Sequence, residues 1–368
     1  MNQWSRFAPT SLPVYATLRS LWRGMYKKEE NIVAQWADRM IEHEGDAWIF
    51  RPSSDYPEQI VRVDRVMRAL VKSRSEMFWS RRVAGMARTA IHPIARALRK
   101  CANMDYGGIK SHFCKQKLSP YFELLAEEFL SHRADVIEGA SPEVAAANAW
   151  VEHIRTIARS SEFTRRVATQ ERSARKNAKA ALGYLQTLYR QHSRLCVVRL
   201  DVGYSAAHRE LLPGRNVDPV RIKRDLATCL RKLRRSYPAL MGYVWKLEFG
   251  PSKSYHVHLM AFLNGHLVRQ DVRIAQAIGE FWQDEVTHFD GSYWNCNARK
   301  EFYERTNSLG IGMVEHDDEA KRRRLEYSLL YLTKADYYVR LSEPGLGRTF
   351  GKGQAGGDSS RKLGRPRM

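Results

Sequence analysis

The segment from Tyr243 to Phe262 constrains the fold most, because it has the pattern of two strands joined by a turn. Tyr243–Phe249 and Tyr255–Phe262 are rich in aromatic and branched residues, as strands are. Between them lies Gly250-Pro251-Ser252-Lys253, which has the composition of a hairpin turn. The segment therefore predicts a β-hairpin and, with it, an antiparallel sheet.

The rest of the C-terminal half alternates strand and helix patterns around this hairpin. In chain order these are a strand at Leu195–Val202, a helix from Asp218-Pro219, a helix from about Gln270 to Glu285, short strands at Ser292–Asn295 and Ile311–Glu315, and a helix from about Asp317. The order predicts an α+β domain over residues 191–340, in which helices flank an antiparallel sheet.

Residues 1–190 have a mostly helical pattern. A helical period of apolar residues runs from Val61 to Ala84, and Phe163 to Arg190 reads as one long basic helix. Arg165, Arg172 and Lys176 on this helix can lie along DNA phosphates, or they can form an ordinary solvated face; the sequence leaves both open. Residues 341–368 are rich in Gly, Ser and Arg, which predicts a flexible basic tail.

Charge and composition narrow the class of protein. Lys and Arg number 61 and Asp and Glu 40, so the net charge is 61 − 40 = +21. This excess favours a polyanionic partner, most often nucleic acid. With 43% hydrophobic residues, no bilayer-length apolar run and no signal-peptide core, we expect a folded cytoplasmic protein without membrane association. The five cysteines are widely spaced and predict reduced, mostly buried thiols.

The second strand of the hairpin carries the first chemical motif. His256 and His258 are two residues apart, so on a strand they point to the same face. If the hairpin register also brings Glu248 to this face, two imidazoles and a carboxylate can hold Mn²⁺ or Mg²⁺. The simpler interpretation is two polar side chains on a half-buried strand. Parity alone does not decide whether Arg199 and Asp201 on the earlier strand face the same site.

The last helix carries the second motif. Tyr327 and Tyr331 are spaced i and i+4, and Lys334 follows Tyr331 by three, so the three line one side of a helix. Beside a metal ion and an ammonium group, a tyrosine hydroxyl can act as a nucleophile toward a phosphate. The competing interpretation is an aromatic pair in the core with a lysine that extends to solvent.

In this order, the two motifs resemble the HUH endonuclease superfamily. The surrounding sequence is similar to replication initiators of the rolling-circle type, specifically the filamentous-phage (inovirus) gene II-like and prophage proteins. The similar segments are GYVWKLEFGPSKSYHVHLMAFLNG, WNCNARK, GIGMVEHDDE, YLTKADYYV and RTFGKG. This resemblance covers roughly residues 194–353.

The resemblance implies that His256, His258 and Glu248 bind the metal and that Tyr331 attacks single-stranded DNA at an origin. The product is a 5′-phosphotyrosyl link, with Lys334 neutralising charge or holding the metal site, and with Tyr327 standing where a second nucleophile would be. The chain lacks a Walker motif, so we expect a separate helicase from a bacterial host. The alternative is a prophage DNA-binding protein that keeps the fold without nicking DNA.

Overall fold

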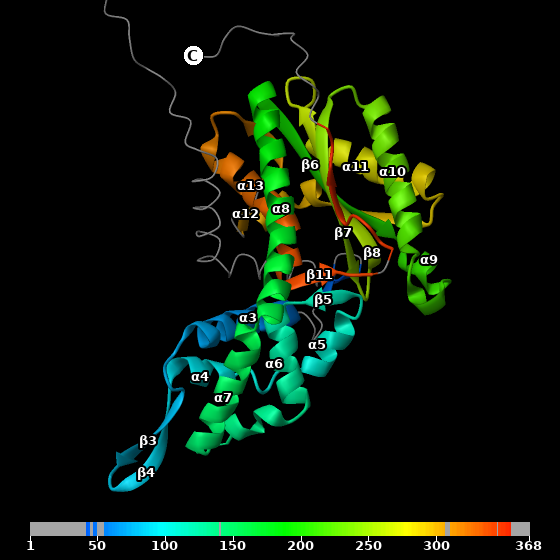
Figure 1. Cartoon of the computed structure of the whole chain (residues 1–368). Helices are drawn as coiled ribbons and strands as arrows, with labels where there is room; N and C mark the ends of the chain where they lie inside the picture. The colour runs from blue at the N-terminus through cyan, green and yellow to red at the C-terminus, as the bar shows by residue number, and fades with distance from the viewer. Residues whose placement is uncertain are drawn as a thin grey trace, which may run out of the picture.

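The computed structural model describes residues 42–44, 47–49, 55–139, 141–305, 310–343 and 345–354, and it is a mixed α+β structure. The predicted fold class is confirmed. A helical part formed by residues before about 160 lies at one end of the molecule, and a sheet covered by helices lies at the other (Figure 1). The long helix α8 (Ser161–Gln191) runs from the first part to the second.

The central sheet is antiparallel throughout. Its strands follow the order β10-β6-β8-β7-β12, and β9 also pairs with β6. The bounds are β6 (Arg194–Tyr204), β7 (Leu240–Gly250), β8 (Ser254–Asn264), β9 (Gly291–Asn295), β10 (Gly312–Glu315) and β12 (Phe350–Lys352). The β7–β8 hairpin is the one that the Gly-Pro-Ser-Lys turn predicts, and it occupies the centre of the sheet.

Helices cover both faces of the sheet, and this is why β8 is buried almost along its whole length. Val257, Leu259 and Ala261 of β8 pack in one core with residues of α10 (Pro219–Ser236) and α11 (Asp271–Phe281). The alternate residues Met260 and Phe262 pack on the other face with α8 and α13 (Glu319–Tyr338). Since successive strand residues point to opposite faces, His256 and His258 lie on the α8 and α13 side.

The helical part has its own core, formed mainly by residues 60–174 and joined by three tyrosines and a valine of the α13 region. We call it the helical-part core. Its helices are α3 (Tyr56–Lys72), α4 (Pro93–Arg99), α5 (Tyr106–His112), α6 (Pro120–Leu130) and α7 (Val144–Arg159). Prolines in the first turn begin α3, α4 and α6, where a missing N–H costs nothing.

Several short elements complete the fold. They are β1 (Glu42–Glu44), β2 (Ala47–Ile49), β3 (Phe78–Val83), β4 (Met86–Ile91), β5 (Gln116–Leu118), β11 (Val339–Leu341), α9 (Ala206–Glu210), α12 (Lys300–Arg305), a π-helical turn at Trp282–Val286, and 3₁₀ turns at Arg133–Ile137, Pro213–Arg215 and Cys296–Arg299. The strand β5 pairs with β11, which directly follows α13. The helical part is thereby joined to the sheet part by backbone hydrogen bonds as well as by α8.

Two sequence expectations differ from the structure. The helical period predicted for Val61–Ala84 ends at Lys72, because Ser73 is extended and Phe78–Val83 forms a strand of a hairpin. The segment 341–368, predicted as a flexible tail, contains the edge strand β12. Gly351 of β12 packs so closely on Trp245 that a Cβ there would lie 2.5 Å from the indole. Residues 355–368 lie outside the described part of the chain.

Candidate metal centre

The register of the β7–β8 hairpin brings the predicted ligands together. Glu248 pairs directly with His256, and Lys246 pairs with His258. Side chains of directly paired residues point to the same face, so Glu248, His256 and His258 share one face. The condition that the sequence left open, the register of the hairpin, is met.

One ligand atom from each of these three side chains lies within 4.8 Å of the other two. His258 Nε2 lies 3.3 Å from Glu248 Oε2, and the two imidazole ring centres are 5.0 Å apart. Both histidines are buried, while Glu248 is half-buried. Two imidazole nitrogens and a carboxylate oxygen are a donor set that fits a divalent ion and leaves coordination positions for a substrate. We call Glu248, His256 and His258 the triad.

Hydrogen bonds fix the orientation of both imidazoles. His258 Nδ1 donates to Asp201 Oδ1 over 2.5 Å, and His256 Nδ1 donates to the carbonyl oxygen of Ser254 over 3.1 Å. The bond of His256 leaves its Nε2 with the lone pair, while His258 presents its Nε2 to Glu248 Oε2. Carboxylates that hold a ligating histidine in this way are typical of metal sites. Asp201, whose direction the sequence left open, therefore belongs to the site.

The electrostatics of the site favour a neutral His256 and an ionised Asp201. Burial, together with the neighbouring His258 and Lys253, lowers the pKa of His256 to about 3. Burial opposes ionisation of Asp201, but the interaction and hydrogen bond with His258 outweigh it and hold the pKa of Asp201 below its ordinary value. A neutral imidazole is the form that binds metal.

A cavity of about 370 Å³ opens beside the triad, between β6, β9 and α12. His256 and Asp201 form part of its wall, so a molecule in the cavity can reach the metal-binding face. Its wall also holds the cationic residues Arg199, Arg209 and Lys253 and the aromatic residues Tyr204, Tyr293, Trp294 and Tyr303. Cationic and aromatic groups together suit a nucleotide, which has an anionic phosphate and a flat base.

Both predicted tyrosines are packed against other parts of the protein in the structure. Tyr331 is 5% exposed and belongs to the helical-part core, and Tyr327 packs beside Leu182 of α8. The sheet is contacted by a row at i, i+4 and i+7 of α13, namely Leu325, Leu329 and Leu332. Because helix residues are about 100° apart, Tyr331 lies on a different side of α13 from this row. The side chain of Lys334 is outside the described part of the structure.

The tyrosine that lines the cavity is Tyr303 on α12, which the sequence did not single out. Its ring lies under the guanidinium of Arg199, 5.6 Å from ring centre to Cζ. No sequence motif places Tyr303 or Arg199 at a fixed spacing from the two histidines. Only the pairing of β6 with β8 and the position of α12 after β9 bring them to the triad.

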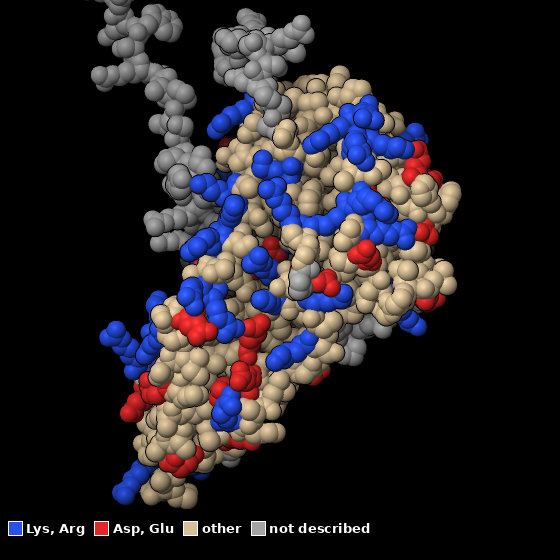
Figure 2. Space-filling model, turned by 45° about the vertical axis from the view of Figure 1, so that its right-hand side comes forward, with Lys and Arg blue, Asp and Glu red and all other residues tan. Residues whose placement is uncertain are grey.

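The side chains predicted to contact DNA, Arg165, Arg172 and Lys176, are all exposed on α8. On the same helix Arg166 and Arg175 form ion pairs, with Glu123 at 2.8 Å and Glu171 at 2.6 Å. Figure 2 shows Lys and Arg side chains spread widely over one face of the sheet-bearing part. Exposure of the three residues is compatible with both predicted interpretations, phosphate contact and solvated face.

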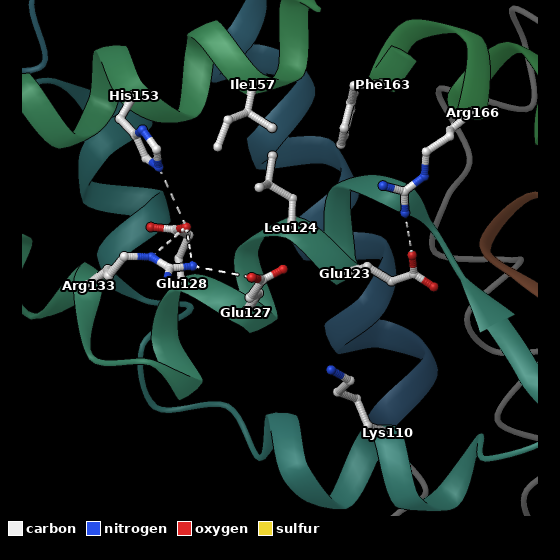
Figure 3. A pocket seen from close by; sticks show the side chains of 10 residues that line it. All are labelled: Lys110, Glu123, Leu124, Glu127, Glu128, Arg133, His153, Ile157, Phe163 and Arg166. Atoms are coloured by element: carbon white, nitrogen blue, oxygen red, sulfur yellow. Dashed lines mark hydrogen bonds and ion pairs between the residues drawn. The ribbon is translucent and has the colours of Figure 1, made fainter.

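A second cavity, of about 570 Å³, lies in the helical part (Figure 3). Its carboxylates are paired with basic groups: Arg133 contacts Glu128 at 2.9 Å, and Arg166 contacts Glu123. Glu128 also accepts a hydrogen bond from the Trp150 indole. The charges that line this cavity therefore stabilise the packing of α6 against its neighbours.

The fold and the triad define a mixed α+β protein with a candidate divalent-metal centre at its central hairpin. The chain belongs to the family of the YagK/YfjJ C-terminal domain, whose model matches residues 157–353. The match begins near the end of α7 and covers α8, the whole central sheet and α13. No curated protein and no solved structure matches the chain.

None of the described helices is long and apolar enough to cross a membrane.

Proposed function

We propose that this protein is a metal-dependent nuclease that nicks and rejoins single-stranded DNA, and that it starts rolling-circle replication of a phage or prophage. The observation that carries the proposal is the triad, in which Glu248 and His256 are paired across the hairpin with His258 beside them. The +21 charge of the chain and the basic cavity next to the triad support DNA as the substrate.

In this proposal the triad binds Mn²⁺ or Mg²⁺, and the bound ion polarises the scissile phosphate. Asp201 keeps His258 oriented toward the ion. Arg199 and Lys253, in the wall of the cavity, neutralise the charge of the phosphate. The adjacent Trp294 offers a flat surface for a neighbouring base.

The nucleophile is a tyrosine whose oxygen bonds to phosphorus, while the 3′ oxygen of the preceding nucleotide leaves and takes up a proton. Tyr331 is the proposed residue, with Lys334 beside it and Tyr327 as a second nucleophile. Because Tyr331 is 5% exposed, its attack requires that α13 expose it to the DNA. Tyr303 is the alternative nucleophile, since it already lines the cavity. We expect the partners to be origin DNA and a host helicase.

A second candidate function is a DNA-binding protein without nuclease activity. The burial of Tyr331 in the helical-part core favours it, because a structural tyrosine is found in such a place. Both functions predict binding to DNA, and only the first predicts a covalent DNA adduct.

The test is to incubate the protein and Mn²⁺ with single-stranded circular DNA of the genetic element that encodes it, and then to run a denaturing protein gel. Nicking activity gives a protein band that carries DNA. The band disappears in His256→Ala and in the variant that lacks the nucleophile, either Tyr331→Phe or Tyr303→Phe. The control His266→Ala changes an exposed histidine that hydrogen-bonds Ser193 outside the triad, and it retains the band. No band from the unmodified chain favours the second function.

A further inference from the structure

The hairpin of β3 and β4 is the feature that the proposed function leaves unexplained. It projects from the end of the helical part, away from the sheet (Figure 1). Apart from Phe78, every residue of β3 is exposed, and so is the first half of β4. A two-stranded ribbon of this kind is marginally stable by itself, so its length beyond the protein surface requires a reason.

The register of the ribbon gathers a specific set of side chains on one face. Trp79 pairs with Ala90, Arg81 with Arg88, and Val83 with Met86. This face therefore carries an indole near the base, two arginines directly opposite each other in the middle, and two apolar residues at the tip. Trp79 is 40% exposed and Met86 is 60% exposed. Arg82 lies on the other face.

Two like charges directly opposite each other destabilise an antiparallel pair. In the described part of the chain, no carboxylate forms an ion pair with Arg81, Arg82 or Arg88. Other exposed arginines of this protein, such as Arg62 with Glu58, do form such pairs. The arginines of the ribbon thus keep their positive charge available for an anion outside the molecule.

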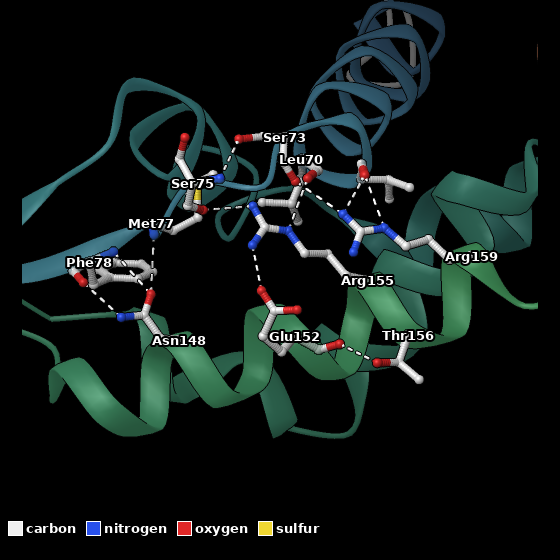
Figure 4. A network of polar contacts seen from close by, with 11 residues as sticks. Leu70, Ser73, Ser75, Met77, Phe78, Asn148, Glu152, Arg155, Thr156 and Arg159 are labelled. Atoms are coloured by element: carbon white, nitrogen blue, oxygen red, sulfur yellow. Dashed lines mark hydrogen bonds and ion pairs between the residues drawn. The ribbon is translucent and has the colours of Figure 1, made fainter.

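The base of the ribbon is held firmly by α7 (Figure 4). The Asn148 amide accepts hydrogen bonds from the backbone N–H groups of Met77 and Phe78 and donates one to the Phe78 carbonyl over 2.7 Å. Arg155, which is buried, donates to the carbonyls of Leu70 and Ser75 just before the ribbon. These bonds satisfy the backbone where α3 ends and fix the direction in which the ribbon projects.

We propose that the β3–β4 hairpin is an arm that binds double-stranded DNA by entering one of its grooves. A two-stranded ribbon fits the major groove, and its arginines then face the phosphates that line it. The apolar tip formed by Val83 and Met86 can contact the sugars or a base step. The arm contacts duplex DNA at a place remote from the triad in the chain, and it does not depend on the nuclease activity of the triad.

Duplex DNA fits this face better than a membrane does. The two arginines lie side by side across the ribbon, which suits phosphates on the two sides of a groove. A lipid surface would favour a wider apolar face than the few residues of this tip.

The test measures fluorescence anisotropy of a labelled duplex at several salt concentrations with EDTA present, which excludes nuclease activity. We expect Arg81→Ser/Arg88→Ser to weaken binding and to reduce the slope of log K against log salt by about 0.9 for each phosphate that the arm no longer neutralises. Arg81→Lys/Arg88→Lys retains the charge and most of the slope. The matched control Arg62→Ser/Arg323→Ser removes two exposed arginines that pair with Glu58 and Glu319, and it keeps the affinity of the unmodified chain.

An equal decrease in affinity for the control and the arm variant would overturn the proposal, because bulk charge alone would then explain the binding. Unchanged duplex binding by Arg81→Ser/Arg88→Ser would also overturn it. So would a result in which that variant loses affinity for phosphatidylserine vesicles but not for DNA. Failure of the proposed nuclease is distinguishable, since the anisotropy is measured in EDTA and the covalent DNA adduct is measured separately on a denaturing gel. Equal thermal unfolding temperatures show that the arm variants are folded.

Discussion

Lys246 on β7 and Asp336 on α13 form an ion pair whose side chains are 2% and 4% exposed. Lys246 is the residue directly opposite His258 in the hairpin, so the ion pair fixes α13 beside the triad. Asn177 of α8 donates a second hydrogen bond to Asp336, over 3.4 Å. One carboxylate thus connects the central sheet with the two helices that cover its metal-binding face.

We expect Asp336→Ala to lower the free energy of unfolding by about 3–5 kcal/mol, because it leaves the Lys246 ammonium buried without a counter-charge. Urea unfolding followed by circular dichroism measures the change. Lys246→Met combined with Asp336→Leu is the control, since it removes both charges and should be more stable than Asp336→Ala. A double variant less stable than the single one would show that the ion pair itself provides the stability.

Metal binding should stabilise the folded protein, because the triad is assembled only when the hairpin is formed. Mn²⁺ at 100 times its dissociation constant adds about 2.7 kcal/mol, seen as a higher temperature of unfolding. His258→Ala should abolish the increase, while the control His266→Ala should keep it. An increase that survives in His258→Ala would mean that the ion binds elsewhere.

Asp201→Asn tests the residue that orients His258. The amide cannot match the ionised carboxylate as an acceptor for His258 Nδ1–H, so we expect Mn²⁺ affinity to fall about 10-fold to 100-fold. Calorimetric titration gives the affinity. Asp290→Asn, which changes a half-exposed carboxylate paired with Arg221 away from the triad, should leave it unchanged.

Two variants of Tyr331 separate packing from chemistry. Tyr331→Ala removes a buried ring and should destabilise the protein by about 3–5 kcal/mol. Tyr331→Phe keeps the ring, so its stability should be much closer to that of the unmodified chain. If Tyr331 is the nucleophile, the phenylalanine variant still binds DNA but forms no covalent adduct. An adduct that persists in Tyr331→Phe and disappears in Tyr303→Phe would assign the role to Tyr303.

The exposed basic residues of α8 lead to a separate prediction about the salt dependence of DNA binding. If Arg165, Arg172 and Lys176 contact phosphates, replacing all three by Ser should reduce the salt slope of duplex binding by up to about 0.9 for each residue. Anisotropy at several salt concentrations measures it. A slope equal to that of the unmodified chain would assign the three residues to the solvated face.

The thiols should differ sharply in reactivity. Cys114 is exposed, whereas the other four cysteines are buried. Burial raises the pKa of Cys101 to about 11 and the pKa values of Cys196 and Cys229 to about 12. We expect only Cys114 to react with a thiol reagent at pH 8, and all five in denaturant. Because the unfolded thiols ionise from about pH 8.5, the folded state should lose stability as pH rises from there toward 11.

The hairpin and the helices of the sheet domain were predictable from the sequence because their signals are local. Alternation and the Gly250-Pro251 turn predict β7 and β8, and Asp218-Pro219 predicts the start of α10, where Asp218 accepts a hydrogen bond from the Val220 N–H. The long basic helix α8 was likewise predictable from its period. These features depend on residues that are neighbours in the chain.

Features that depend on residues far apart in the chain were not predictable. Met77 and Phe78 continue the apolar period of α3, yet Met77 lies in a bend and Phe78 begins a strand, because Asn148 and Arg155, on α7, bind the backbone around them. The segment of β12 lacks a strand composition because its stability comes from pairing with the edge of β7.

By itself, the sequence determined which residues can bind a metal ion: a histidine pair on one strand and a glutamate on the next. Whether they meet depends on the hairpin register, which pairs Glu248 with His256. The tertiary structure alone decided that Asp201 orients His258, that Tyr303 lines the cavity, and that Tyr331 is buried in the helical-part core. The physical reason is that a side chain's chemistry is local, whereas its partners are set by strand pairing and by the way a helix faces its neighbours.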